Sequence, residues 1–446
     1  MAGAVLDVPV DLWARVRADL LSTPGLERAA AGFAGIASNG STTRLLLRDW
    51  TPVPPDEYLV QLGYHLEVSP IFWARSAKRS RASGEALVII HSHPGDPDRP
   101  RFSPSDYAGE ALLVPKVRAR ARVPVGAVVV SAGGATARVT EDWGSRSMEV
   151  RVVGRPSTHA SRRGADDAWD RQIRALGGEG QSALRNLTVG VVGAGGTGSH
   201  VLQQCVHLGV GRVIVVDPDR VTITNLSRLV GGSRWDVWLR RRKTRVARRL
   251  ARRIGRSTVV EPVDRSVTTR AGAERLLGCD VVFGCTDNHL SRTLLNALAF
   301  QYYVPVMDLG VELQSADAMG GRVAWLAPGG ACLWCMGILD SERVRIEQLP
   351  ADLRRDEEAR GYIRGVEEPA PAVISINGVV ASIAVTEVLA RFTEFAGSQR
   401  RSTLLLYRLT DGVVRGTSPP SRPGCPTCSA SGLLGAGELA PPAWLT

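Results

Sequence analysis

The sequence predicts an α/β protein with two domains. Over residues 187–219 a buried-strand pattern, a glycine turn, a helix and a second strand follow one another, and strand and helix patterns alternate after them. This alternation is typical of a doubly wound, mostly parallel sheet. Residues 1–154 carry their own strand and helix patterns and end at the small, polar stretch 155–168. We therefore expect a smaller α/β domain, a linker and a Rossmann-like domain over residues 169–428.

The bulk composition indicates a soluble chain. It has 446 residues, 44% of them hydrophobic and 22% charged, which is enough for two or three domains. No apolar run reaches the ~18 residues of a membrane helix, and the N-terminus, with Asp7 and Asp11, lacks a signal-peptide layout. The Gly-, Ala- and Pro-rich residues 429–446 predict a flexible tail. We expect a cytoplasmic protein without a membrane segment.

The net charge of +11 raises the question of a nucleic-acid surface. Its densest part is the arginine-rich stretch 240–256, which also carries apolar residues at helical spacing, namely Val246, Ala247, Leu250 and Ile254. Because no aromatic residues are interleaved, an exposed helix face is favoured over nucleic-acid binding. An acidic protein partner would be attracted equally well.

The patterns of the N-terminal domain place two histidines at the end of a strand. Helices are expected at residues 12–20, 26–32 and 68–84 and from residue 103, and strands at residues 35–38, 43–49, 86–94, 124–131 and 135–140. The histidines belong to the strand pattern 86–94, which makes this strand end the first candidate site.

Two histidines and an acid near this strand end suit a metal. His91 and His93 are two residues apart on an extended segment, so their side chains face the same side, and Ser103 and Asp106 follow. Two imidazoles and a carboxylate offer three ligands to zinc and leave one position for water, whose pKa zinc lowers to about 7. A separate carboxylate is needed to carry the proton, and Ser103 suits a hydrogen bond to an oxyanion.

The motif H-x-H-P followed by S-x-x-D resembles the JAMM/MPN metalloprotease family, which includes deubiquitinases. The matching residues are His91, His93, Pro94, Ser103 and Asp106. The resemblance implies a catalytic zinc and a catalytic glutamate that precedes a strand of small residues. Glu27 fits that place better than its rival Glu85, which directly precedes the strand 86–94.

One departure from this family and one alternative stay open. Twelve residues separate His93 from Asp106, more than is usual in the family, and the intervening loop has to absorb the difference. The alternative is that both histidines are packed or solvated loop residues, because inactive members of this fold exist.

The glycine turn of the second domain predicts a phosphate site. Its glycines are Gly193, Gly195, Gly196 and Gly198. A turn without side chains lets backbone N–H groups approach a phosphate at the positive end of the next helix. Asp217 and Asp219 end the second strand, where a carboxylate accepts from a ribose hydroxyl. Taken alone, this pattern favours NAD.

Residues further along favour an adenylating enzyme instead. They are Asn225, Arg228 and Lys243 and, after the strand pattern 279–287, Asp287, Asn288 and Arg292. Hydride transfer has no need for this set. ATP chemistry does, because cations must neutralise the triphosphate and the departing pyrophosphate, and a carboxylate must hold Mg²⁺.

From about residue 168 to residue 428 the chain resembles the ThiF/MoeB family, the ancestors of ubiquitin-activating enzymes. The resemblance implies that the glycine turn, Asp217 and Asp219 hold ATP. It assigns Asn225, Arg228 and Lys243 to the phosphates, Asp287 to Mg²⁺ and Asn288 to the nucleotide site. Arg171 matches an arginine that reaches into the partner's site, which implies a homodimer.

The chain has seven cysteines, and four of them form two C-x-x-C pairs. Cys332, Cys335, Cys425 and Cys428 predict a closed, structural zinc site in a reducing compartment, in preference to a redox pair. No cysteine lies between Cys335 and Cys425, where relatives that form thioesters carry their nucleophile. We therefore expect adenylation without an enzyme thioester.

These observations combine into one functional hypothesis. The N-terminal domain trims a ubiquitin-like or sulfur-carrier protein with one catalytic zinc, and the second domain adenylates the exposed carboxylate with ATP and Mg²⁺. The alternatives are adenylation of a peptide, small-molecule or tRNA-base substrate, and a scaffold that only binds a ubiquitin-like partner.

Overall fold

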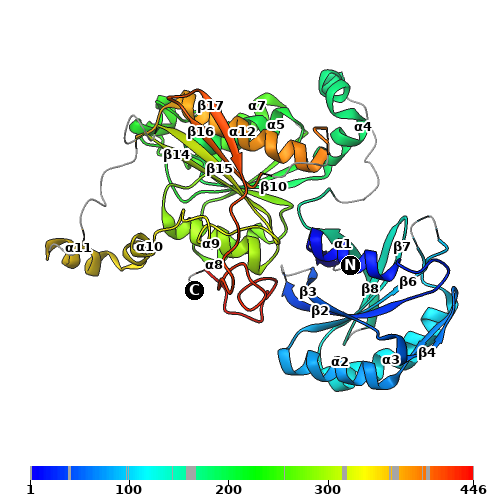
Figure 1. Ribbon diagram of the computed structural model, residues 1–446. Coiled ribbons are helices and arrows are strands. Elements are labelled where there is room, and N and C mark those ends of the chain that lie inside the picture. Colours follow the sequence, from blue (N-terminus) through cyan, green and yellow to red (C-terminus); the bar gives the residue numbers. More distant parts are fainter. Residues whose placement is uncertain are drawn as a thin grey trace. The chain divides into compact units, whose positions relative to one another are not determined.

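The computed structural model describes most of the chain. The described residues are 3–38, 42–96, 98, 100–142, 144–156, 167–255, 257–313, 319–360, 363, 371–393, 395–397 and 402–444. They divide into two compact units (Figure 1). The barrel unit comprises Met1–Val153, Gln301–Tyr303 and Ala430–Pro442, and the sheet unit comprises Gly154–Phe300, Val304–Ser429 and Ala443–Thr446. Most of the predicted linker, residues 157–166, lies outside the described residues.

The barrel unit is built on a closed barrel with strand order β1-β3-β2-β6-β7-β8-β9. These strands are β1 (Ala4–Val8), β2 (Ala29–Ser38), β3 (Thr43–Pro52), β6 (Ala86–Ser92), β7 (Val125–Ser131), β8 (Gly134–Glu141) and β9 (Gly144–Val152). The helices are α1 (Val10–Leu20), α2 (Pro70–Ser83) and α3 (Pro104–Ala121), and β4 (Tyr58–Gln61) and β5 (Leu66–Val68) form a separate small sheet. The barrel closes because β1 pairs in parallel with both β3 and β9.

The strands β2 and β6 are apolar on both faces, because both faces are covered. One cluster joins alternate residues of these strands, such as Ala34 and Val88, to α1. The other joins the intervening residues, such as Phe33 and Leu87, to α2 and α3. Since successive side chains of a strand alternate, His91 points to the same side as Leu87, toward the helices.

The helix expected at residues 26–32 is wrong, because Ala29–Ser38 is the strand β2. Its alanines favour a helix by intrinsic propensity, but small side chains also fit where a strand is packed on both faces. At Gly32 a Cβ would lie 2.9 Å from Leu47 Cδ1, so the interior has no room for more. Tertiary packing therefore overrides local propensity here.

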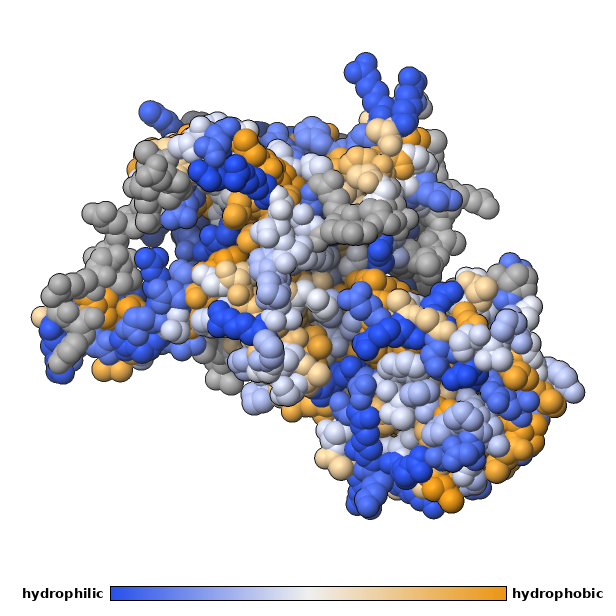
Figure 2. Space-filling model, in the orientation of Figure 1, coloured by the Kyte–Doolittle hydropathy of each residue, from blue (hydrophilic) through white to orange (hydrophobic). Residues whose placement is uncertain are grey.

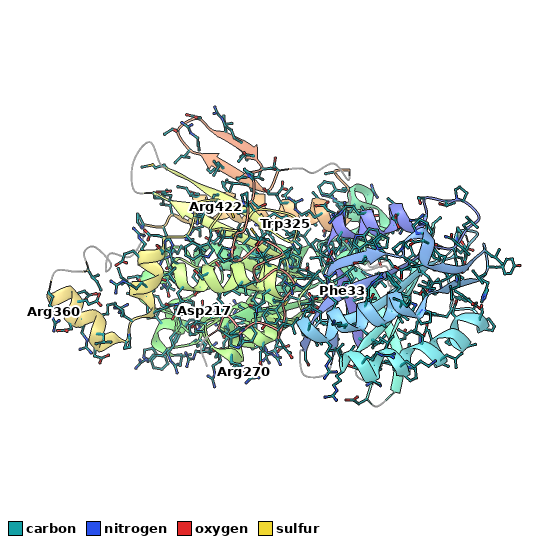
Figure 3. The ribbon with its side chains drawn as sticks, turned by 60° about the horizontal axis from the view of Figure 1, so that its bottom comes forward. Phe33, Asp217, Arg270, Trp325, Arg360 and Arg422 are labelled. Carbon is teal, nitrogen blue, oxygen red and sulfur yellow. The ribbon has the colours of Figure 1, made fainter. Side chains whose placement is uncertain are left out.

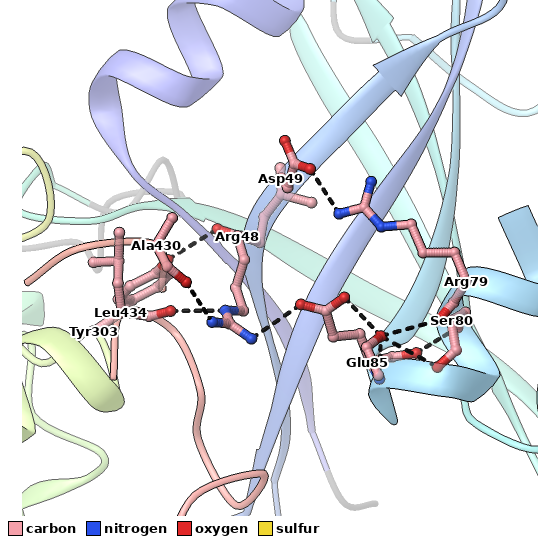
Figure 4. Close-up of polar contacts among 10 residues, drawn as sticks. Arg48, Asp49, Arg79, Ser80, Glu85, Tyr303, Ala430 and Leu434 are labelled. Atoms are coloured by element: carbon pink, nitrogen blue, oxygen red, sulfur yellow. Dashed lines mark hydrogen bonds and ion pairs between the residues drawn. The ribbon is translucent and has the colours of Figure 1, made fainter. Parts of the chain in front are cut away.

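The C-terminal segment Ala430–Pro442 belongs to the barrel unit, which differs from the expected flexible tail. Arg48 of β3 donates from Nε to the Leu434 carbonyl at 2.8 Å and from Nη2 to the Ala430 carbonyl at 3.0 Å. The same guanidinium lies 3.0 Å from Glu85 Oε1 (Figure 4). A single arginine thus satisfies backbone acceptors of a segment that has no regular secondary structure of its own.

The sheet unit contains an eight-stranded sheet with strand order β12-β11-β10-β13-β14-β15-β16-β17. The first five strands in this order are parallel and the others antiparallel: β10 (Thr188–Val192), β11 (Arg212–Val216), β12 (Val259–Val263), β13 (Val281–Gly284), β14 (Val306–Glu312), β15 (Gly320–Leu326), β16 (Leu404–Arg408) and β17 (Val413–Thr417). The predicted α/β, Rossmann-like architecture is confirmed.

Helices flank this sheet on both faces (Figure 1). The helices of this unit are α4 (Asp170–Asn186), α5 (Gly196–His207), α6 (Arg234–Trp238), α7 (Lys243–Ile254), α8 (Arg270–Ala273), α9 (His289–Gln301), α10 (Ser341–Gln348), α11 (Ala351–Ala359) and α12 (Ile374–Thr393). Of these, α10 and α11 extend away from the sheet (Figure 1). The main core joins residues of α5, α7 and α12 to β10, β11, β13 and β14. On the visible surface, apolar residues are interspersed with polar ones in both units (Figure 2).

The helix α12 is long and apolar enough to cross a membrane by length and composition, although no such run was expected from the sequence. In the fold its residues Val380, Ala384 and Val388 are part of the main core of the sheet unit. A buried core helix meets the same criterion, so α12 by itself carries no membrane assignment.

Candidate nucleotide and metal sites

The glycine turn between β10 and α5 is closed by contacts that exclude side chains. Gly193 has φ +89°, and a Cβ there would lie 2.6 Å from the Cys285 carbonyl oxygen. A Cβ on Gly198 would lie 1.8 Å from the Gly193 carbonyl oxygen. These two glycines therefore allow the first turn of α5 to pack against the preceding strand ends, which leaves the backbone of the turn open to a ligand.

Asp217, at the end of β11, holds this turn in place (Figure 3). Its Oδ2 accepts from the Ala194 N–H at 2.7 Å, and its Oδ1 accepts from the Asp219 N–H at 2.7 Å. Burial raises the pKa of Asp217, against the opposing effect of Lys243. Both oxygens are thus occupied by backbone, and Asp219 is the acid available to a ribose.

A cavity of about 520 Å³ opens at the carboxyl ends of the parallel strands. The predicted residues that line it are Gly193, Gly195, Gly196, Asp217, Asp219, Asn225, Arg228, Lys243, Asp287 and Asn288. Gly198 and Arg171 are not among the described lining residues. Gly198 lies beneath the turn, and Arg171 is an exposed residue of α4.

Basic residues line the cavity from the side of β11. Lys243 begins α7, and its Nζ lies 2.7 Å from Asp219 Oδ2. Arg228 packs beside the turn, because a Cβ on Gly196 would lie 3.2 Å from its Cδ, and its Nη1 donates to the Thr224 carbonyl at 2.9 Å. These cations face the space in front of the glycine turn, where a phosphate chain would carry its charge.

Polar residues also follow β13. Asp287 is exposed, while Asn288 Oδ1 accepts from the Ser291 N–H at 2.8 Å and so caps α9. Arg292, one turn into α9, donates to the Thr286 carbonyl at 2.9 Å and lines the same cavity. The cavity therefore collects a free carboxylate and several cations, as the transfer of a nucleotidyl group requires.

The ThiF family model matches residues 169–427, which is more than half of the chain and includes every residue of this cavity named above. The chain belongs to the ThiF family.

Curated relatives match over the same length. The sulfur carrier protein adenylyltransferase of Thermus thermophilus is 38% identical over 265 residues, 59% of this chain and 90% of that protein. The SAMP-activating enzyme E1 of Haloferax volcanii is 28% identical over 269 residues, 60% of this chain and 90% of that protein. The molybdopterin-synthase adenylyltransferase of Salmonella typhimurium is 26% identical over 264 residues, 58% and 95% of the two chains. Residues 169–427 thus form a ThiF-family adenylyltransferase domain, and residues 1–168 lie outside the family match.

The ThiF domain brings the four paired cysteines together. The Sγ atoms of Cys332 and Cys425 are 3.6 Å apart, those of Cys335 and Cys428 are 3.7 Å apart, and all four lie within 4.8 Å of one another. Zn–S bonds of about 2.3 Å in a tetrahedron place sulfurs about 3.8 Å apart, so the set fits zinc. Four donors fill the coordination sphere, which is typical of a structural site.

The other cysteines of the ThiF domain, of which Cys205 and Cys279 are buried and Cys285 is partly buried, are poorly suited to act as nucleophiles. Burial raises the pKa of Cys205 to about 12, and burial followed by the charge of Asp308 raises the pKa of Cys285 further. A thiol in such surroundings holds little thiolate at neutral pH. Part of the loop where relatives carry a thioester cysteine, residues 364–370, lies outside the described residues, but its sequence contains no cysteine.

The barrel unit brings together the predicted His and Asp residues. His91 Nε2 lies 3.2 Å from Asp106 Oδ1, and His93 Nε2 lies 3.4 Å from Asp106 Oδ2. Donors about 2.0–2.1 Å from a tetrahedral zinc lie about 3.3 Å apart, so these spacings fit a metal. His91 Nε2 is buried, and apart from its contact with Asp106 it makes no hydrogen bond of regular geometry among the described residues, so it is available to bind an ion.

Glu27 is the acid beside this cluster. Its Oε1 lies 3.7 Å from His93 Nε2, whereas Glu85 is bound to Arg48 and Ser83. Burial raises the pKa of Glu27 against the opposing charges of the two histidines. The sequence favours Glu27 over Glu85 because of its position before a strand of small residues. In the structure, Glu27 lies next to the three candidate metal donors.

Ser103 orients Asp106, the candidate metal-binding acid. It is the N-cap of α3: its Oγ accepts from the Asp106 N–H at 3.2 Å, and Asp106 Oδ2 accepts from the Ser103 N–H at 2.6 Å. The long loop before it is tied to β7 and β8, because Ser131 Oγ donates to the Asp98 carbonyl and Thr136 Oγ1 to the Pro100 carbonyl. These ties hold the described residues of a loop that is longer than in the resembled family.

Proposed function

We propose that the ThiF domain uses ATP and Mg²⁺ to adenylate the C-terminal carboxylate of a ubiquitin-like or sulfur-carrier protein. The observation that carries the proposal is the single cavity in which the glycine turn, Arg228, Lys243 and Asp287 meet. The names of two relatives, a sulfur carrier protein adenylyltransferase and an activating enzyme, support this substrate class.

Each residue has a role that follows from its position. Asp219 accepts from the ribose, and the N–H groups of the glycine turn, with Arg228 and Lys243, neutralise the phosphates. Asn225 and Asn288 complete the nucleotide site, and Asp287 holds Mg²⁺. The acyl-adenylate then passes to an external sulfur or amine, because the buried thiols of Cys205 and Cys285 are unsuited to form a thioester.

Exchange of labelled pyrophosphate into ATP in the presence of candidate carriers tests this step. We expect exchange that depends on the carrier and falls by about 10²-fold or more in Asp287→Ala, because an uncompensated triphosphate is poorly stabilised. Asp352→Ala removes an exposed carboxylate of α11 and serves as the matched control. Carrier-dependent exchange that survives Asp287→Ala would contradict the proposal.

We further propose that the barrel unit is a zinc peptidase that trims the carrier or releases it from conjugates. The supporting observation is the set of His91, His93 and Asp106 with Glu27 beside it. Zinc bound there supplies a Lewis acid and a water of lowered pKa. Glu27 then takes up and returns the proton, and Ser103 orients Asp106 through its cap.

Zinc analysis and a cleavage assay test the peptidase. The full chain should hold two zinc ions, one in each cluster. Glu27→Gln should retain both and lower cleavage of a C-terminally extended carrier by about 10²–10⁴-fold. Glu67→Gln, at an exposed position of β5, is the control. One zinc per chain, with no cleavage by the wild type, would favour a silent barrel unit that only binds its partner.

Assembly and location complete the proposal. We infer a homodimer in which Arg171, exposed on α4, reaches the partner's nucleotide site, and a cytoplasmic protein, since paired thiols suit a reducing compartment. Scattering at micromolar concentration tests the dimer. If pyrophosphate exchange requires a peptide, a small carboxylate or a tRNA instead of a carrier protein, the alternative biosynthetic function replaces the one proposed.

A further inference from the structure

A buried carboxylate in the ThiF domain lacks the hydrogen bonds that burial demands. Asp308 on β14 has no exposed side-chain surface, and neither of its oxygens has a hydrogen-bond partner among the described residues. Arg292 Nε lies 3.5 Å from Oδ1, and Arg322 Nη2 lies 3.7 Å from Oδ2. In the described part of the chain, the Nε atoms of both arginines also have no hydrogen-bond acceptor. Three polar groups thus converge without completing their bonds, which in a native fold needs an explanation.

The arrangement depends on a missing side chain. Arg322 on β15 pairs with Gly310 on β14, and a Cβ on Gly310 would lie 2.6 Å from both Cζ and Nη1 of Arg322. The guanidinium therefore lies close to the Cα of Gly310. A side chain at residue 310 would displace the guanidinium of Arg322, so this position of the guanidinium requires a glycine at residue 310.

The two arginines have more hydrogen-bond donors than the buried carboxylate can accept. Arg292 and Arg322 face Asp308, the exposed Glu312 also acts on Arg322, and both arginines line the cavity of the glycine turn. Burial raises the pKa of Asp308, and the charges of Arg292 and Arg322 partly oppose this shift. Burial lowers the pKa of Arg322, and the charge of Asp308 partly opposes that shift. A small anion that accepts from both arginines would satisfy the open donors.

The position in the sheet indicates which anion this is. The glycine turn and Asp219 belong to β10 and β11, while Arg322 is on β15, three strands from β10 in the sheet order. Strands about 4.8 Å apart put the backbone of Arg322 about 14 Å from the strand of the glycine turn, and its guanidinium, which lies over β14, about 10 Å from that strand. Apolar residues line this end of the cavity, namely Leu309, Val311, Leu313 and Ile338. Such surroundings suit an uncharged chain with one terminal carboxylate better than a polyphosphate.

We propose that Arg322, with Arg292, binds the terminal carboxylate of the acyl substrate, a peptide end that enters over β14 and β15. This rests on the proposed adenylation. One carboxylate oxygen accepts from the guanidinium groups, and the other attacks the α-phosphorus of ATP. An acyl–phosphate bond forms, the bond between the α-phosphorus and the bridging oxygen breaks, and pyrophosphate leaves with its electron pair. Arg292 links the two halves, since it also donates to the Thr286 carbonyl beside Asp287.

Peptide binding to the full chain tests this assignment. The probes are a pentapeptide ending in Gly-Gly with a free carboxylate and the same peptide as its amide, titrated calorimetrically with α,β-methylene-ATP and Mg²⁺ present. Wild type should prefer the carboxylate by about tenfold or more, since a charge-assisted pair is at stake. Arg322→Met should reduce this preference to below about twofold, and Arg322→Lys should restore part of it.

A second variant displaces the guanidinium but keeps its charge. In Gly310→Ala the three nearest atoms to the new Cβ all belong to the end of the Arg322 side chain, so the fold should persist while the preference is lost. Gly178→Ala on α4 has nothing within 4 Å and is the control. The affinity for the nucleotide analogue should stay within about twofold throughout.

Three results would overturn the assignment. They are an unchanged preference in Arg322→Met and Gly310→Ala, a parallel loss of nucleotide affinity, and a wild type that does not distinguish carboxylate from amide. The proposed adenylation fails separately, if the wild type does not bind the nucleotide analogue at all.

Discussion

The two candidate metal clusters differ in how many donors they offer and in how the chain supplies them. Four thiols from two segments about ninety residues apart complete the cluster of the ThiF domain. The barrel cluster has three donors from residues 91–106, with Glu27 beside them. Four protein ligands fill a tetrahedral site and leave no position for a reacting molecule, whereas three protein ligands leave the fourth position open. Donor number thus separates a structural role from a catalytic one.

The supports of the two clusters differ as well. His91 ends a strand of a closed barrel, and Asp106 is fixed in the first turn of α3 by the Ser103 cap. Regular structure therefore places the barrel donors before any ion arrives. Both cysteine pairs lie in turns, where an ion itself supplies the crosslink. We expect zinc to contribute to folding in the ThiF domain and far less in the barrel.

Loss of a thiolate should have the largest effect. Cys335→Ser removes one of four donors, and structural zinc contributes on the order of 10 kcal/mol to folding of the segments that it joins. The melting temperature should fall by more than about 20 °C, or the soluble yield should collapse. Differential scanning fluorimetry and zinc analysis measure both. Cys205→Ala, a buried cysteine outside the cluster, is the control, and equal stability of the two variants would break the comparison.

Loss of a barrel donor should change zinc content more than stability. His93→Ala should leave one zinc per chain and lower the melting temperature by no more than about 5 °C, because the strand and helix around it are held by their own cores. His65→Ala, an exposed histidine of the same unit, controls for loss of an imidazole. A collapse as large as that of Cys335→Ser would show that the barrel ion is structural too.

The sequence predicted the nucleotide cavity and the barrel cluster because most of their functional residues lie within short segments of the chain. The glycine turn with Asp217 and Asp219 occupies one strand–helix–strand unit, and parallel strands bring their carboxyl ends to one edge, so Asp287 joins the same cavity. His91 and His93 share a strand end, and Asp106 starts the next helix. In each case the positions of these residues in their strands and helices determine where their side chains point.

What depends on pairing between distant segments could not be predicted. Arg322 lies opposite Gly310 because of the antiparallel register of β14 and β15, and no sequence pattern predicts that register. The Gly-, Ala- and Pro-rich residues 429–446 predict a flexible tail, yet Arg48 of β3 donates hydrogen bonds to the carbonyl groups of Ala430 and Leu434. The first residues of β2, Ala29 to Gly32, are predicted as helix because alanine has a high helix propensity, whereas packing on both faces makes them part of a strand.

The smallest effect should come from the cap that orients the barrel acid. Ser103→Ala removes the hydroxyl that accepts from the Asp106 N–H, but the Ser103 N–H still donates to Asp106 Oδ2. Loss of an N-cap costs about 1 kcal/mol, so the melting temperature should fall by only a few degrees. Zinc affinity of the barrel should weaken by about tenfold, because an orienting partner of a ligand is disturbed. Competition with a chromophoric chelator measures it. Ser103→Thr keeps the cap and should restore both values, whereas an unchanged affinity in Ser103→Ala would mean that the backbone N–H alone aims the carboxylate.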